Sequence, residues 1–235
     1  MGSKVHPSNP LILFKVSTIK QRLRPRRTIT FSSSSYSQNQ QAQELKSELY
    51  RVKFRTLGDC KLGISNYPDF DYNAEGGKGT GSGSKVAESN SNDDILVSFD
   101  LKTLYIPPLT SSTTKFLGLP LPPFLKISID PELFRGSINQ NSGQIDLEFK
   151  AKFWFSVGSV YNAPPLVVET VLTSEESVGK MRSGRGERLD KDGKCRLVGV
   201  ATVGPIVDFF MNSFLGLPTE CLADLNAIIS FPDSS

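Results

Sequence analysis

Residues 144–158 read Gln-Ile-Asp-Leu-Glu-Phe-Lys-Ala-Lys-Phe-Trp-Phe-Ser-Val-Gly, and every odd position from Ile145 to Val157 is apolar. The even positions between them hold Asp, Glu, Lys, Lys, Trp and Ser. Side chains of a β-strand alternate between the two faces of a sheet, so this period of two predicts a long strand with one face in a core. Because each fully buried large apolar side chain contributes roughly 1.5–3 kcal/mol, we expect this face to be the largest local contribution to stability.

The segments around this strand predict its partners. Asn139–Gly143 has the composition of a turn, so 133–138 is expected to form a hairpin with the long strand. Lys191-Asp192-Gly193 predicts a second hairpin turn. The remaining strands are expected at 50–55, 60–65, 95–101, 166–173, 187–190 and 194–203.

Together these segments predict a mainly β (α+β) fold. We expect one antiparallel domain over 44–231, a β-sandwich or barrel of about eight strands, and the sequence does not separate the two forms. Two short C-terminal helices are expected within 205–230, because apolar residues there change to helical spacing after Gly204-Pro205. Strands first and helices last argue against a parallel α/β fold.

The segment 75–94 has a different composition from the rest of the domain. It is rich in Gly, Ser, Asn and Asp, with glycine at positions 76, 77, 79, 81 and 83. Such a segment has few side chains to bury, so we expect an exposed, flexible loop. It is not a phosphate-binding P-loop, because Lys78 is followed by Gly79 rather than by Ser or Thr.

The first 43 residues resemble an organellar leader in composition. They hold seven Lys or Arg, eight Ser and no Asp or Glu, so the formal charge of +3 for the chain becomes 20 − 24 = −4 beyond position 43. Acid-poor, Arg- and Ser-rich N-termini are typical of transit peptides. The basic cluster 22–27 followed by Ser32–Ser35 favours a plastid transit peptide, and hence the chloroplast stroma, over the mitochondrial matrix.

The expected domain lacks the residues that several kinds of catalytic and metal-binding sites require. The only histidine, His6, lies in the expected leader, so catalytic triads and histidine metal sites are not expected in the domain. Cys60, Cys195 and Cys221 lack zinc-ligand spacing, and buried thiols are expected, with a Cys195–Cys221 disulfide left open. No stretch predicts a transmembrane span, and a net-acidic domain is a poor general nucleic-acid binder. We predict no catalytic residue, no metal and no cofactor.

The first functional hypothesis is a non-catalytic protein that binds a lipid or another apolar ligand. Its candidate residues are Phe149, Phe153 and Phe155 of the long strand, together with Trp154. The small residues along 195–203 are expected to pack closely against these phenylalanines. Antiparallel barrels and sandwiches can enclose an apolar cavity, and the alternative is that the same residues fill a solid core.

The second hypothesis is an assembly or interaction factor for a chloroplast membrane complex, or a protein in peripheral contact with the membrane itself. The segment Phe-Leu-Gly-Leu-Pro occurs at 116–120 and again at 214–218, so both copies are expected in the same layer, as a lid or a contact surface. The candidate surface residues are Phe116, Leu117, Leu119, Phe124, Arg182, Arg185 and Arg188.

A third hypothesis, ranked below the other two, is a carboxylate-based enzyme. Asp69, Asp71 and Glu75 are its candidates, because a pair of carboxylates can carry acid–base chemistry without histidine. It requires these carboxylates to converge in a polar cleft. We therefore expect that the protein is not an enzyme, and that its partner is an apolar molecule, a lipid or a plastid protein.

Overall fold

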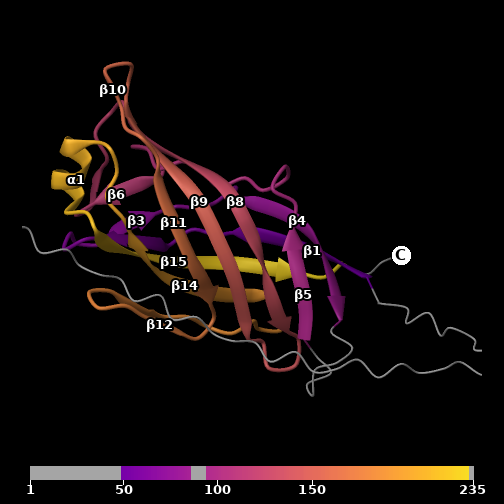
Figure 1. Cartoon of the computed structure of the whole chain (residues 1–235). Coiled ribbons are helices and arrows are strands. Elements are labelled where there is room, and N and C mark those ends of the chain that lie inside the picture. Colours follow the sequence, from indigo (N-terminus) through magenta and orange to yellow (C-terminus); the bar gives the residue numbers. More distant parts are fainter. Residues whose placement is uncertain (1–48, 86–93, 233–235) are drawn as a thin grey trace, which may run out of the picture. The chain divides into compact units, whose positions relative to one another are not determined.

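The computed structural model describes residues 49–85 and 94–232 (Figure 1). The expected leader, 1–43, lies outside these residues. The structure is almost entirely antiparallel β-sheet with one short helix, which confirms the predicted fold class. No helix in the described ranges is long and apolar enough to cross a bilayer.

Eight strands close into a ring, so the fold is a barrel and not a sandwich. The last strand of the chain closes it by pairing with the first, with Phe54 opposite Ile229. In order around the ring the strands are β1 (Leu49–Thr56), β4 (Lys78–Lys85), β5 (Asp94–Phe99), β8 (Leu125–Asn139), β9 (Ile145–Val157), β11 (Leu166–Thr173), β14 (Lys194–Val203) and β15 (Thr219–Ser230).

A side sheet continues from the ring. The second half of β15 pairs with β1, while its first half pairs with β2 (Cys60–Ile64). Beyond β2 come β3 (Phe70–Tyr72), β6 (Thr114–Phe116) and β7 (Leu119–Pro120). The short β10 (Tyr161–Asn162) extends β9, and β12 (Glu176–Val178) pairs with β13 (Ser183–Arg185) as a separate hairpin.

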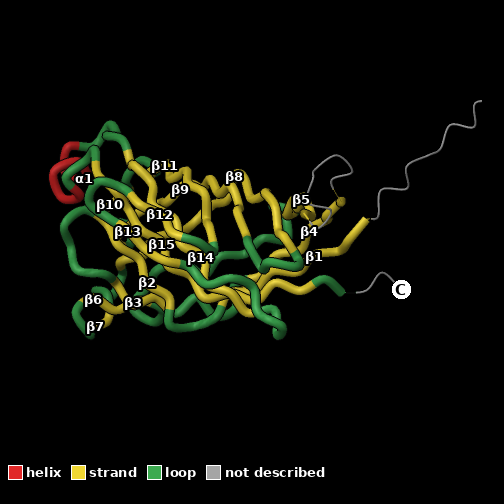
Figure 2. The backbone as a smooth tube through the Cα atoms, turned by 90° about the horizontal axis from the view of Figure 1, so that it is seen from below, coloured by secondary structure: helices red, strands yellow, loops and turns green. Residues whose placement is uncertain are grey.

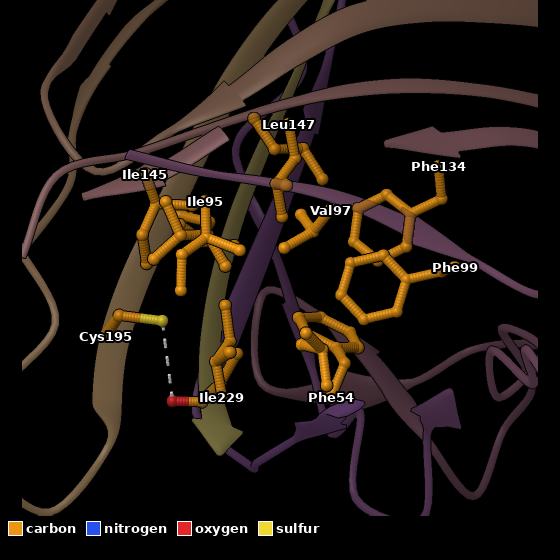
Figure 3. Packing of buried hydrophobic residues seen from close by; sticks show 14 of the residues in the cluster. Phe54, Ile95, Val97, Phe99, Phe134, Ile145, Leu147, Cys195 and Ile229 are labelled. Carbon is orange, nitrogen blue, oxygen red and sulfur yellow. Dashed lines mark hydrogen bonds between the residues drawn. The ribbon is translucent and has the colours of Figure 1, made fainter. Parts of the chain in front are cut away.

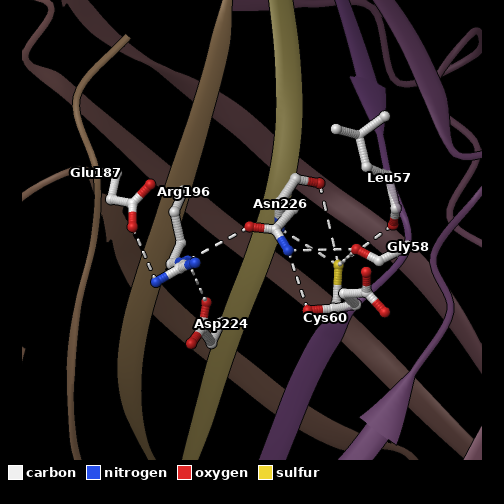
Figure 4. Close-up of polar contacts among 8 residues, drawn as sticks. Leu57, Gly58, Cys60, Glu187, Arg196, Asp224 and Asn226 are labelled. Carbon is white, nitrogen blue, oxygen red and sulfur yellow. Dashed lines mark hydrogen bonds and ion pairs between the residues drawn. The ribbon is translucent and has the colours of Figure 1, made fainter. Parts of the chain in front are cut away.

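The split of β15 occurs at a bend between β1 and β2 that Asn226 holds in place. Its side-chain amide donates to the carbonyl oxygens of Gly58 and Asp59, at 3.3 and 3.0 Å, and its backbone N–H points to the sulfur of Cys60 (Figure 4). Asp59 has a positive φ of 54°. One asparagine therefore replaces the ladder hydrogen bonds that the bend interrupts.

The long strand forms where the sequence predicted it, as β9, and its hairpin partner is β8. Ile138 faces Ile145 at the turn, and the register continues to Leu125 opposite Val157 with an irregularity between Pro131 and Leu133. The inward side chains of β9 include Ile145 and Leu147, which are completely buried.

One end of the barrel is filled by a packed core. Rings of Phe99 and Phe134 stack with centroids 4.5 Å apart, and Phe54 meets Phe134 edge-on at 5.2 Å. Aliphatic side chains from β5, β9, β14 and β15 complete this core, as Figure 3 shows. Cys195 lies in it as a free thiol, and its burial raises the pKa to about 12.

The expectation of an exposed loop over 75–94 is wrong for the part that the structure describes. Residues 78–85 form β4, a strand of the ring with β1 on one side and β5 on the other. A Cβ atom at Gly81 would lie 2.4 Å from the backbone carbonyl oxygen of Ser98, and one at Gly79 or Gly83 would lie within 3.0 Å of a side-chain carbon of Leu104 or Ile95. Residues 86–93 lie outside the described ranges.

The expectation of two helices within 205–230 is also wrong for the second one. Only α1 (Phe209–Leu215) forms; Asp208 caps its first turn and Gly216 ends it in the left-handed conformation. Residues 219–230 form β15, which is hydrogen-bonded along both edges. The apolar residues of this segment fit a helical period, but apolar residues also occupy every odd position from 221 to 229, as in a strand. Pairing with the neighbouring strands selected the strand over the helix.

Cys195 and Cys221 do not form the disulfide that the sequence left open. Both are free, and they lie apart along the β14–β15 ladder, where Cys195 faces Ala227 and Cys221 faces Ala201.

Candidate apolar ligand site

The barrel encloses an apolar cavity of about 580 Å³, between the packed end and α1. Its walls come from ring strands β1, β8, β9, β11, β14 and β15, from side strands β2, β3, β6 and β7, and from α1. A volume of this size lies within the range of small-molecule sites, about 300–1,000 Å³.

Three phenylalanines of β9 form one wall of the cavity. Phe149, Phe153 and Phe155 point inward with the buried residues of the strand, yet each remains half-buried. All three line the cavity, which accounts for the part of each ring that remains exposed.

The small residues of β14 and β15 leave this space open. Ala201 and Ala223 lie on the cavity wall together with the thiol of Cys221. Ala201 and Val203 belong to a buried cluster against which Phe153 and Phe155 pack, and these residues also line the cavity.

The hydroxyl groups on the cavity wall are already used as donors. Tyr72 donates to the carbonyl oxygen of Pro107 and Thr56 to that of Ala74, each at 2.5 Å. Tyr67 and Thr170 donate to Phe214 and Val200, at 2.7 and 2.9 Å. The wall therefore offers a ligand apolar surface and no free hydroxyl hydrogen.

Charge is also absent from the lining. None of the described residues that line the cavity is Asp, Glu, Lys, Arg or His. Burial raises the pKa of the Tyr72 hydroxyl, and it raises that of the Cys221 thiol to about 11, so both groups are neutral near pH 7. A charged group inside this cavity would lose its hydration without compensation.

At the end of the cavity near α1, which we call its mouth, aromatic rings form an arc, of which Tyr67, Phe116 and Phe214 line the cavity. Tyr67 contacts Phe116 and Phe214, with ring centroids 6.4 and 5.8 Å apart. Phe210 continues the arc from Phe214 to Tyr161, at 5.7 and 5.6 Å. Tyr67 thus contacts one phenylalanine from each Phe-Leu-Gly-Leu-Pro copy, and both of these phenylalanines line the cavity.

Trp154 does not join the other three candidate ligand residues. It lies on the outer face of β9, is 42% exposed, and is not among the residues that line the cavity. The alternation of the strand requires this, because Trp154 occupies an even position between two inward phenylalanines.

The candidate interaction residues separate into two groups. Leu117, Leu119 and Phe124 are strongly exposed, whereas Phe116 stacks on Phe70 at 4.7 Å; Phe116 and Leu119 both line the cavity. Leu117 and Leu119 lie in the β6–β7 hairpin, and Phe124 directly precedes β8.

The three arginines are mostly engaged in the structure of the protein. The Arg182 side chain is only 13% exposed; it forms an ion pair with Asp69 and donates to the carbonyl oxygens of Ser65 and Tyr67. Arg188 forms an ion pair with Glu175, and Arg185 is exposed. The basic loop therefore fastens neighbouring segments more than it presents free charge.

Glu220 anchors the same loop through hydrogen bonds to its backbone. Its buried carboxylate accepts the backbone N–H groups of Lys180, Met181 and Arg182 at 2.7–3.0 Å, and these bonds lower its pKa. The carboxylate satisfies a turn of the backbone and is not directed into the cavity.

The candidate catalytic carboxylates do not converge. Asp69 is bound to Arg182, Asp71 faces Lys61 and Lys115 across its strand, and Glu75 is exposed. None of the three lines the cavity. Within the described ranges no group of three or more His, Cys, Asp or Glu is placed to hold a metal ion.

The sequence reasoning did not identify Tyr67, Tyr161 or Phe210 at the mouth. The repeated pentapeptide was the one available signal, because it marked two of the segments that meet there. No protein-family model, curated protein or solved structure matches the chain.

Proposed function

We propose that the protein binds a lipid or another apolar molecule in the barrel cavity, without catalysis. The observation that carries this proposal is the cavity of about 580 Å³ whose wall is apolar and whose hydroxyl hydrogens are all bonded within the protein. Closely packed interiors contain few voids larger than a water molecule, so an open volume of this size favours a ligand.

The cavity also limits the kind of ligand. If each non-hydrogen atom takes the share of a water molecule, about 30 Å³, the cavity holds on the order of 20 atoms. The inner part of the ligand must be apolar, since nothing in the described lining would replace lost hydration. A polar group of the ligand would therefore remain at the mouth, near Tyr67 and Tyr161.

A cavity-filling substitution tests this proposal. Ala223→Phe adds a ring to the cavity wall, so we expect it to weaken binding of the neutral probe N-phenyl-1-naphthylamine by about tenfold or more. Val171→Phe is the matched control, because Val171 is 47% exposed outside the cavity. Probe fluorescence measures the affinity, and native mass spectrometry measures the stoichiometry.

Cys221 supplies a second measurement in the same experiment. It is the cysteine that lines the cavity, while Cys60 and Cys195 are buried elsewhere. Bound probe should slow the alkylation of Cys221 in the unmodified protein. Equal probe affinity in both variants, with no protection of Cys221, would refute the proposed cavity ligand.

We also propose that residues 1–43 direct the protein to the chloroplast stroma, on the basis of their composition. The full chain fused at its C-terminus to a fluorescent protein should enter chloroplasts, and the same fusion lacking 1–43 should remain outside. Import into mitochondria would support the alternative location, and identical distributions of the two fusions would contradict a leader.

A further inference from the structure

Exposed apolar side chains gather at the mouth of the barrel from three separate segments. Phe124, Val160 and Phe209 are 79%, 91% and 87% exposed, and each has exposed apolar neighbours within its own segment. We name these segments, 117–124, 157–160 and 207–214, the rim. Single exposed apolar residues are common on protein surfaces, but a gathering from several segments marks an interaction site.

Contacts between neighbouring segments place the rim together at the cavity mouth. The backbone N–H of Gly158 donates to the carbonyl oxygen of Phe124 at 2.9 Å, which joins the first two segments. Tyr161, the residue that follows the second segment, contacts Phe210 of the third, with ring centroids 5.6 Å apart. Figures 1 and 2 place α1, β10 and the β6 region at the same end of the barrel.

The helix of the rim exposes aromatic rings. Met211 and Leu215 are buried and line the cavity, Phe214 lines it while remaining partly exposed, and Phe209 and Phe210 are exposed beside the polar Asn212 and Ser213. The seven residues include no charged one, so the outer side of the helix presents mainly apolar surface.

The charges around the rim complement a phosphate-bearing surface. Asp208, the one acid of the rim, already accepts from the Met211 N–H and the Tyr161 hydroxyl, each at 2.8 Å. Lys126, two residues beyond Phe124, is exposed and forms no ion pair with any described residue. Lys115 faces Asp71 across β3 and β6, so those two charges offset each other.

We infer that the rim docks on the surface of a lipid bilayer and places the cavity mouth against it. Projecting tips that each carry a few apolar side chains suit a bilayer, which adapts to their shape, better than a partner groove. This inference rests on the proposed function, because an apolar ligand then passes between membrane and cavity without crossing water. Apolar insertion combined with cationic attraction is how interfacial segments bind membranes.

Vesicle flotation of the full chain tests the inference. The rim variant replaces Phe124, Val160 and Phe209 by serine, and the control variant replaces the exposed Leu96, Leu101 and Val171, which lie outside the rim. None of the six substitutions changes the net charge, so the basic residues of 1–43 contribute equally to vesicle binding in every protein. On phosphatidylcholine vesicles, with and without phosphatidylglycerol, the rim variant should bind about tenfold more weakly than the control.

Hydrogen exchange on the same vesicles locates the contact. Amides of 117–124, 157–160 and 207–214 should become protected when vesicles are added, and protection elsewhere alone would overturn the inference. Equal flotation of the rim and control variants would also overturn it. If the protein forms a dimer that depends on the rim and does not bind vesicles, a second copy of the chain covers the rim instead.

The probe assay separates this inference from the proposed function. If the rim variant keeps its affinity for N-phenyl-1-naphthylamine but vesicle binding is absent throughout, docking fails and the cavity ligand stands. If vesicles bind through the rim but the probe does not enter the cavity, docking stands and the proposed ligand function fails.

Discussion

Replacing Leu147 by alanine is expected to lower the free energy of unfolding by about 3–5 kcal/mol. Leu147 is completely buried in the packed end of the barrel, among the residues that Figure 3 shows. Close packing around it prevents the neighbouring strands from filling the space that the lost side chain leaves. The loss therefore combines the transfer free energy of the removed atoms with the cost of a new void.

Phe153 is the matched position on the same strand, with a different expected result. It points inward from β9 but borders the cavity and is only half-buried. Phe153→Ala removes more atoms, yet it deletes fewer packing contacts because one side of the ring already faces empty space. We expect a loss of about 1–2 kcal/mol, below the usual range for a buried phenylalanine.

Urea unfolding followed by circular dichroism measures both losses. A change in midpoint without a change in slope would show that the variants unfold from the same compact state. If Phe153→Ala costs as much as Leu147→Ala, the space beside Phe153 is packed and the cavity is not open in solution.

Replacing Gly81 by alanine is expected to cost about 2–4 kcal/mol, although it adds only one methyl group. A Cβ atom at Gly81 would lie 2.4 Å from the carbonyl oxygen of Ser98 and 2.9 Å from the Cα of Phe99. Both are backbone atoms of the adjacent strand β5, so they cannot move aside as a side chain could. Relief would require the β4–β5 ladder to separate locally.

Gly204→Ala is the control for this substitution. Nothing lies within 4 Å of a Cβ atom at Gly204, and its φ does not fall in the left-handed region. Its effect should be within about 0.5 kcal/mol of zero, or slightly stabilising, because alanine restricts the unfolded chain. Equal stability of the two variants would mean that β4 is not held in the ring, as the loop expectation implied.

Local alternation was sufficient to predict the strands whose inward side chains are large. The long strand at 145–157 and its hairpin with 133–138 appear as predicted, because seven apolar residues in alternate positions leave one arrangement that buries them. The same alternation directs Phe149, Phe153 and Phe155 to the inside and Trp154 to the outside.

The prediction failed where pairing with distant strands decided the structure. In β4 the inward residues are glycines, so no apolar pattern marks the strand, and only the closeness of β5 and Leu104 explains them. In β15 both a helical and an alternating pattern were present, and hydrogen bonding to β1, β2 and β14 selected the strand.

The candidate site divides in the same way. Its phenylalanine wall follows from the sequence of β9, whereas the cavity itself also depends on wall residues from other strands, among them the small Ala201 and Ala223. The mouth depends on Tyr67, which joins segments at 116 and 214 that are nearly one hundred positions apart in the chain.

The sequence by itself determined the antiparallel β class, the long central hairpin, the inward direction of three phenylalanines and the basic, acid-free character of the first 43 residues. Each depends on neighbours in the chain, through the two-residue period of a strand or through composition alone. Only the tertiary structure decided that the sheet closes into a ring, that β4 and β15 belong to it, and that a cavity remains inside with an apolar rim. These features arise from contacts between residues far apart in the chain, and whether a volume is filled or left open depends on all its walls at once.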